Sequence, residues 1–221
     1  MQIGAVFDWD GVIVDSSVQH ERSWERLAVE ENKQLPSGHF EKSFGMKNER
    51  VIPDVLGWTD RPEEIQRLSL RKEALYRVLV QETGLSPLPG TRTFLSRLAE
   101  AGIPCVIGSS THRLNIETTL DVMDLRGFFQ DIVSAEDVSH GKPDPEVFLT
   151  AATRINRQPE ACFVFEDAHV GIEAGLAGGF AVIGVASTHP RETLVGARHV
   201  VDRLDELSIV DLSGLLVAPR S

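Results

Sequence analysis

The sequence has few cysteines and no long apolar run. Its 221 residues include two cysteines, Cys105 and Cys162, which lie inside apolar segments with no CxxC spacing or nearby histidine. This number excludes a disulfide framework, and the surroundings predict buried thiols in a reducing compartment. No apolar run approaches the roughly 20 residues of a transmembrane helix. No charged and then apolar leader precedes the strand-like residues from Ile3, so we expect a cytoplasmic protein.

Positive charge is also scarce. Lysine and arginine total 22 against 33 aspartates and glutamates, a net charge of −11 with neutral histidines. Nucleic-acid grooves and anionic membranes need a basic face, so neither partner is expected. The apolar share of 42% and the charged share of 25% are typical of a globular protein with a buried core. The length favours one domain, or a core with a smaller insert.

Two kinds of pattern alternate along the chain. Residues 3–7 form a short apolar run, and residues 16–84 then show helical periodicity with many charges. From Pro87 onward, strand-like and helix-like segments alternate. The predicted strands lie within 103–110, 131–137, 161–167, 180–187 and 199–201, and the predicted helices within 91–101, 112–125, 145–156 and 171–179.

The predicted strands barely alternate between apolar and polar residues, which indicates a parallel sheet covered by helices on both faces. We therefore predict an α/β fold: a doubly wound, Rossmann-like parallel-sheet core with an inserted α-helical cap domain. The core comprises residues 1–15 and 86–221, and the cap comprises residues 16–85.

Four predicted strands lead into polar groups. These are Asp8 and Asp10 with Gly11 after the first strand, Ser109, Ser110 and Thr111 after the second, Lys142 after the third, and Glu166 and Asp167 after the fourth. Each group alone has an ordinary explanation as a turn, a helix cap or a solvated side chain. Ligands of open parallel sheets bind at the carboxyl ends of the strands, so the four together predict one functional site.

This set of residues suits phosphoryl transfer. Converging carboxylates of Asp8, Asp167 and Glu166 need a cation, and oxygen ligands of this kind select Mg²⁺, which neutralises them and clamps a phosphoryl oxygen. Asp8 could attack phosphorus and form an aspartyl-phosphate. Asp10 would face the leaving oxygen if the chain bends at Gly11, as general acid and then general base.

The phosphoryl group itself needs donors and positive charge. The Ser109 hydroxyl, with Ser110 and nearby backbone N–H groups, would bind the phosphoryl oxygens, and Lys142 would balance their charge.

The motifs FDWDGVIVDS, VIGSS, GKPDPEVF and FEDAHVGIEAGLAGG resemble those of the haloacid dehalogenase superfamily of aspartate-dependent phosphohydrolases. The insert after the first motif is similar to the small helical (C1-type) cap of its β-phosphoglucomutase-like subfamily. The resemblance implies that Asp8 is the nucleophile and Asp10 the acid and base. It implies a Mg²⁺ shell from Asp8, the Asp10 carbonyl and Asp167, with Glu166 further out. Ser109 and Lys142 would hold the phosphate.

The resemblance extends into the cap. His20 and Trp24 match an HxxxW pattern, Gly45 matches the glycine that opens the substrate loop, and Lys72 in RKEALY matches a cap lysine. We expect His20 to act at the hinge, facing Asp10, and Trp24 to lie in the cap core. Lys72 is either a substrate contact or a solvated helix residue.

The substrate loop departs from the mutase pattern. Where the mutase has Ser-Arg after the glycine, this chain has Lys47 and Asn48, with Arg50 displaced by two positions. Lys47 or Arg50 would grip a second phosphate from another angle, or the substrate carries one phosphate. His112 and Arg113 only approximate the mutase residues after the second motif. The stretch GMKNERVIPDVLGW, followed by RKEALY, is also similar to plant and bacterial phosphatases of a ribitylamino-pyrimidine phosphate.

We therefore predict a Mg²⁺-dependent phosphatase that hydrolyses a small phosphomonoester, a sugar or polyol phosphate, through an aspartyl-phosphate. The alternatives are phosphoglucomutase-type transfer within a sugar phosphate and a non-catalytic phosphosugar sensor. Asp10 argues against a dehalogenase or a phosphonate hydrolase, and a nucleophile on the first strand argues against a phospho-receiver module. The expected partner is a small phosphorylated metabolite, and the default state is a monomer.

Overall fold

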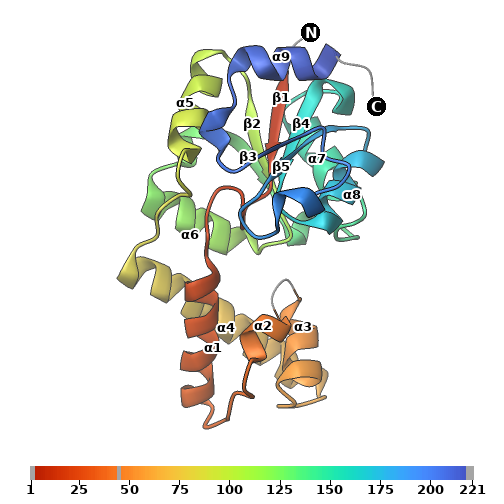
Figure 1. The fold of residues 1–221 in the computed structure, drawn as a ribbon. Helices are drawn as coiled ribbons and strands as arrows, with labels where there is room; N and C mark the ends of the chain where they lie inside the picture. The colour runs from red at the N-terminus through yellow and green to blue at the C-terminus, as the bar shows by residue number, and fades with distance from the viewer. Residues whose placement is uncertain (1–2, 44–45, 218–221) are drawn as a thin grey trace. The chain divides into compact units, whose positions relative to one another are not determined.

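The computed structural model describes residues 3–43 and 46–217 (Figure 1). Its centre is a six-stranded sheet in the order β3-β2-β1-β4-β5-β6, and every neighbouring pair is parallel. The strands are β1 (Gly4–Phe7), β2 (Cys105–Gly108), β3 (Phe129–Val133), β4 (Cys162–Glu166), β5 (Ala181–Val185) and β6 (His199–Val201). The order reverses between β1 and β4, which confirms the predicted doubly wound core.

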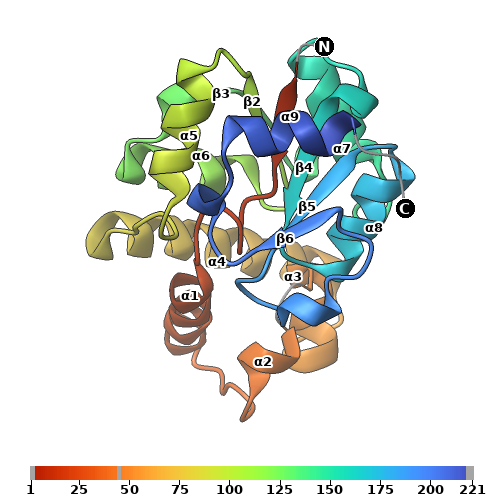
Figure 2. The ribbon, with the colours of Figure 1, turned by 45° about the horizontal axis from the view of Figure 1, so that its top comes forward.

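Helices cover both faces of this sheet (Figures 1 and 2). They are α5 (Thr91–Glu100), α6 (Arg113–Met123), α7 (Glu146–Arg154), α8 (His169–Ala177) and α9 (Ile209–Val217). Apolar side chains of α5, α6 and α9 form one buried cluster with strand residues such as Phe7 and Phe165, whose rings stack at 4.5 Å. Those of α7 and α8 form a second cluster with Val6 and Val164. Successive strand residues point to opposite faces, so an unbroken apolar run serves both clusters.

The structure differs from the sequence-based prediction at two places in the core. The third strand begins at Phe129 and ends at Val133, because Ser134 and Asp137 form a capping box that turns the next residues into a 3-10 helix. Helix α9 was not predicted. Single 3-10 turns occupy Arg126–Phe128, Ala135–Asp137, Pro159–Ala161, Arg191–Thr193 and Leu204–Glu206.

The chain divides into two compact units. One comprises the residues up to Asp15 and those from Leu85 onward, called the core unit below; the other is Ser16–Gly84, called the inserted unit. In the inserted unit, α1 (Ser17–Glu30) packs along α4 (Pro62–Thr83), with α2 (His39–Ser43), α3 (Asn48–Arg50) and a π-helical turn (Val51–Val55) beside them.

The inserted unit has its own apolar core. Trp24, Leu27, Ile52, Leu68 and Leu75 are buried there. Trp24 thus packs as expected, with its ring 6.1 Å from that of Trp58. Over the described part of the chain, no helix combines the length and the apolar character needed to cross a membrane.

Candidate active site

The site begins where β1 ends. Asp8 continues the sheet, since its N–H donates to the carbonyl of Phe165 on β4 at 3.0 Å. The chain then turns sharply: Gly11 has a φ of +78°, and its N–H donates to the carbonyl of Val14 at 2.8 Å. This left-handed conformation favours glycine. The bend that the sequence predicted at Gly11 is therefore present.

Lys142 lies between two carboxylates of the core unit. Its Nζ is 2.8 Å from Oδ1 of Asp8 and 2.6 Å from Oε1 of Glu166, and its side chain is 7% exposed. Burial alone would lower the pKa of Lys142, but the charges of Asp8 and Glu166 outweigh it and raise that pKa. The lysine therefore stays charged and faces Asp8.

Asp8, Glu166 and Asp167 gather three carboxylates, with one oxygen of each lying within 4.8 Å of the others. Burial, followed by the charges of Asp8 and Glu166, raises the pKa of Asp167 to about 8. Burial also raises the pKa of Glu166, although Lys142 opposes that shift. Such a cluster favours a bound cation, because the carboxylates repel one another.

The three carboxylates have different surroundings. Glu166 is tied on both oxygens, since it accepts from Lys142 and, at 2.7 Å, from the N–H of Ala168. A Cβ on Gly11 would lie 2.1 Å from Oδ2 of Asp167, so the backbone approaches this carboxylate closely. The oxygen donors and the close cradle fit a small divalent cation.

The loop after β2 meets Asp10. The hydroxyl of Thr111 donates to Oδ2 of Asp10 at 2.6 Å, and the Thr111 N–H donates to the Ser109 hydroxyl at 3.2 Å. Ser109 is 2% exposed and continues the sheet through an N–H bond to the carbonyl of Val133. Ser110 is exposed. The two loops predicted to carry acid chemistry and phosphate binding are thus joined by a hydrogen bond.

In the inserted unit, His20 and Lys72 lie together. Nζ of Lys72 is 2.7 Å from Nδ1 of His20 and 3.0 Å from Oε1 of Glu73, and the Lys72 side chain is 3% exposed. The alternative of a solvated surface lysine is therefore wrong. The His20 ring stacks on Tyr76 at 4.2 Å, and the Lys72 ammonium lies 5.5 Å from the centre of the Trp24 ring.

Of the residues predicted for the substrate loop, Asn48 is bound inside the inserted unit, whereas Lys47 and Arg50 are exposed. Asn48 points into the inserted unit, where its amide donates to Glu73 at 2.6 Å and to Ser69 at 3.1 Å. Arg50 has a 72% exposed side chain and pairs with Asp54 at 2.8 Å. Lys47 is exposed. Gly45 lies outside the described residues.

Comparison with known proteins decides the family. Residues 4–179 match the family model of the haloacid dehalogenase-like hydrolases. The chain belongs to this family. The match confirms both the predicted family and the predicted enzyme class, a hydrolase.

The chain is also similar to individual phosphatases and mutases of known name. The chain is 39% identical over 216 residues to an Arabidopsis thaliana chloroplastic 5-amino-6-(5-phospho-D-ribitylamino)uracil phosphatase, covering 96% of this chain and 57% of that protein's length. It is 30% identical to β-phosphoglucomutase of Bacillus subtilis, covering 92% of this chain and 91% of the relative. A crystal structure of β-phosphoglucomutase from Clostridium difficile superposes with a TM-score of 0.82 at 26% identity, covering 98% of this chain and 97% of that one.

This hydrolase carries contacts that sequence reasoning missed, in the loop after β5. The Ser187 hydroxyl donates to the carbonyl of Gly11, and the Thr188 hydroxyl donates to Oδ2 of Asp167. Nδ1 of His189 lies 3.1 Å from the Asp167 carbonyl oxygen. The rule that polar groups gather at the carboxyl ends of parallel strands applies to β5 as well, and would have flagged these residues.

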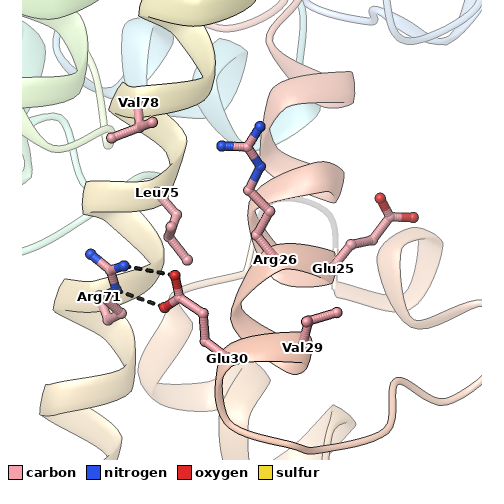
Figure 3. A pocket seen from close by; sticks show the side chains of 7 residues that line it. All are labelled: Glu25, Arg26, Val29, Glu30, Arg71, Leu75 and Val78. Carbon is pink, nitrogen blue, oxygen red and sulfur yellow. Dashed lines mark hydrogen bonds and ion pairs between the residues drawn. The ribbon is translucent and has the colours of Figure 1, made fainter.

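A surface groove of the hydrolase lies elsewhere. It runs between α1 and α4 of the inserted unit, has a volume of about 510 Å³, and is crossed by the Arg71–Glu30 ion pair (Figure 3). Its lining consists of Glu25, Arg26, Val29, Glu30, Arg71, Leu75 and Val78. None of the acidic cluster, Ser109 or Lys142 is among these residues, so the groove does not coincide with the candidate active site.

Proposed function

We propose that this chain is a Mg²⁺-dependent phosphatase that hydrolyses a small phosphomonoester, a sugar or polyol phosphate, through a phosphorylated Asp8. One observation carries the proposal: the Asp8 carboxylate lies 2.8 Å from the Lys142 ammonium and within 4.8 Å of Glu166 and Asp167. A nucleophile beside both a fixed cation and a cation-binding cluster suits attack on a dianionic phosphate. In the proposal, residues 16–84 act as the cap domain.

Asp8, Asp167 and the backbone carbonyl of Asp10 would hold Mg²⁺, while Glu166 orients Lys142. When bound, the ion neutralises the carboxylates and polarises a phosphoryl oxygen. Support comes from the raised pKa of Asp167, which burial and the neighbouring acids bring to about 8. A cation at this place would offset the burial and the repulsion that raise this pKa.

The reaction proceeds in two displacements. A carboxylate oxygen of Asp8 attacks phosphorus, the phosphorus–ester bond breaks, and Asp10 gives its proton to the departing alkoxide. Water then attacks the phosphorus of phospho-Asp8, the bond between phosphorus and the Asp8 oxygen breaks, and the Asp10 carboxylate takes a proton from that water. Inorganic phosphate leaves, and both aspartates return to their initial states. Ser109, Ser110 and Lys142 hold the phosphoryl oxygens throughout.

The residues of the inserted unit favour a substrate with one phosphate. Asn48, which stands near the position of the mutase arginine, is bound to Glu73 and Ser69, and Glu73 also neutralises Lys72. These contacts support a substrate without a second phosphate. The name of the Arabidopsis relative supports a ribityl phosphate that carries a pyrimidine as the first candidate.

A phosphate-release assay tests the proposed function. Purified protein with Mg²⁺ should release phosphate from at least one member of a panel of sugar, polyol and ribitylaminouracil phosphates. Asp8→Asn should lower the rate by at least about 10³-fold while the circular dichroism spectrum stays unchanged, because the amide cannot act as the nucleophile. Equal release by both proteins, or none by either, would refute the proposal.

A second assay separates the phosphatase from a mutase. The protein receives β-glucose 1-phosphate with a trace of the 1,6-bisphosphate. Formation of glucose 6-phosphate without net phosphate release would favour the mutase alternative. The cytoplasmic location and the monomeric state stay predictions, and light scattering of the purified protein checks the latter.

A further inference from the structure

Thr111 forms hydrogen bonds with both the proposed general acid, Asp10, and the proposed phosphate-binding residue, Ser109. Its hydroxyl donates to Oδ2 of Asp10 at 2.6 Å, and its N–H donates to the hydroxyl of Ser109 at 3.2 Å. Its carbonyl accepts from the N–H of Ala135 at 3.3 Å. Thr111, in the loop that follows β2, is thus bonded both to the proposed acid and to the proposed phosphate-binding serine.

The segment around Thr111 is held firmly. Glu136 accepts from the N–H of Arg113 through both oxygens, at 3.2 and 3.3 Å, and lies 2.9 Å from Nδ1 of His112. The Arg113 side chain adds bonds of 2.7 Å to Asp137 and to the carbonyl of Ile132. These contacts fix the first turn of α6 against the end of β3. Thr111 therefore offers its hydroxyl from a defined position.

We propose that Thr111 is a positioning residue for Asp10, an inference that rests on the proposed function. A carboxyl group can rotate about its bond to Cβ, and only some orientations face the departing oxygen. The Thr111 hydroxyl holds one carboxylate oxygen, which restricts that rotation. Proton delivery needs the acid within hydrogen-bond reach of the leaving group, so the restricted orientation speeds this step.

The effect depends on the leaving group. An alkoxide leaves from phosphorus only with a proton, whereas p-nitrophenolate leaves readily without one. The value of kcat/KM covers binding and the first displacement, in which the leaving group departs. A defect in the orientation of Asp10 therefore slows the cleavage of an alkyl phosphate far more than that of p-nitrophenyl phosphate.

The experiment compares Thr111→Val, which removes the hydroxyl at nearly constant volume, with Thr111→Ser, which keeps it. The substrates are p-nitrophenyl phosphate and the alkyl phosphate that the panel above selects. Thr111→Val should lower kcat/KM for the alkyl phosphate by about 10- to 100-fold, because a displacement of about 1 Å in a catalytic group has that scale of effect. It should leave p-nitrophenyl phosphate within about 3-fold, and Thr111→Ser should restore both within about 3-fold.

Thr118→Val is the matched control. Its hydroxyl bonds the carbonyl of Leu114 within α6, away from the acids, so both activities should match the wild type. Equal losses on both esters with Thr111→Val would show direct phosphate binding or a disturbed fold, and would overturn the inference. If Thr111→Val cleaves both esters at wild-type rates, the positioning role of Thr111 is overturned and the proposed function is not. A wild-type protein inactive on both esters would overturn the proposed function together with it.

Discussion

Gly11 and Asp167 approach so closely that a Cβ atom on Gly11 would lie 2.1 Å from Oδ2 of Asp167. The glycine also has a φ of +78°, a conformation that other residues rarely adopt. The same Oδ2 of Asp167 accepts from the Thr188 hydroxyl. The bend after β1 therefore sets the place of Asp167 as well as the direction of Asp10.

Replacing Gly11 with alanine should damage the cation site more than the fold. The new methyl group must push Asp167 aside, and the backbone must hold a left-handed residue at a cost of about 1–2 kcal/mol. We expect the thermal stabilisation by Mg²⁺ to disappear and phosphate release to fall by at least about 100-fold, since a 1 Å displacement has that scale of effect. Melting curves with and without Mg²⁺ measure the first effect.

Gly102→Ala is the control for the backbone cost. Gly102 has a φ of +67°, and a Cβ there would meet nothing within 4 Å. This variant should lose a similar 1–2 kcal/mol, roughly, from strain alone. It should keep its response to Mg²⁺ and its activity. A Gly11→Ala protein that still gains stability from Mg²⁺ would contradict the proposed place of the ion.

Lys142→Met should destabilise the core unit. The substitution leaves Asp8 and Glu166 close together without the ammonium that lies 2.8 and 2.6 Å from them. Removal of one partner from a buried ion pair costs about 3–5 kcal/mol. Urea unfolding at neutral pH measures this loss, and Lys42→Met on the exposed part of α2 should cost less than about 0.5 kcal/mol. A Lys142→Met protein as stable as the wild type would show that the three groups are not coupled.

Much of the core site was predictable from the sequence because local signals mark it. Buried strands are short apolar runs, and parallel strands bring the residues that follow them to one edge. Asp8, Ser109, Lys142 and Asp167 follow four such runs, so the topology alone places them on the same side of the sheet. The raised pKa of Asp167 then follows from burial among like charges.

Contacts between side chains far apart in the chain could not be predicted in this way. The bond from Asn48 to Glu73 joins two helices of the inserted unit, and neither residue type signals a partner through local spacing. The bond from Thr188 to Asp167 depends on where a loop folds back after β5. Such pairings are set by tertiary packing, which a periodic pattern does not encode.

The affinity for Mg²⁺ should increase with pH. Burial and then the charges of Asp8 and Glu166 raise the pKa of Asp167 to about 8, so the metal-free site holds a proton below that pH. Mg²⁺ must displace this proton, and its apparent affinity should rise by up to about tenfold per pH unit between about pH 6 and pH 8. The shift in melting temperature with Mg²⁺ concentration measures the affinity at each pH.

The same proton sets the stability of the metal-free protein. The pKa of Asp167 is higher in the folded state than its unfolded value of 3.8, so the folded state binds more protons between these two values. The contribution of Asp167 to stability therefore falls as pH rises from about 4 to about 8. Asp167→Asn removes this group and should make the fall over this pH range shallower, while Glu166, whose pKa is also raised, stays. A wild-type curve that rises over the same range would contradict the assignment.

We expect Glu73 to reduce the positive charge that Lys72 of the inserted unit could present to a substrate. Its Oε1 lies 3.0 Å from the Lys72 ammonium and accepts from the Asn48 amide at 2.6 Å. The acid thereby compensates Lys72 and holds Asn48 inside the unit. Both effects should work against the binding of a second phosphate.

Glu73→Gln should therefore shift specificity toward bisphosphates. The amide carries no charge to compensate the buried Lys72 ammonium, so an added anion should bind more tightly by about 1–2 kcal/mol, roughly a tenfold gain. We expect the ratio of kcat/KM for a sugar bisphosphate to that for the corresponding monophosphate to rise by about tenfold. Glu82 lies on α4, as Glu73 does, and forms an exposed ion pair with Arg26 of α1. Glu82→Gln should leave the ratio unchanged. An equal ratio in the Glu73→Gln and wild-type proteins would mean that Lys72 does not face the substrate.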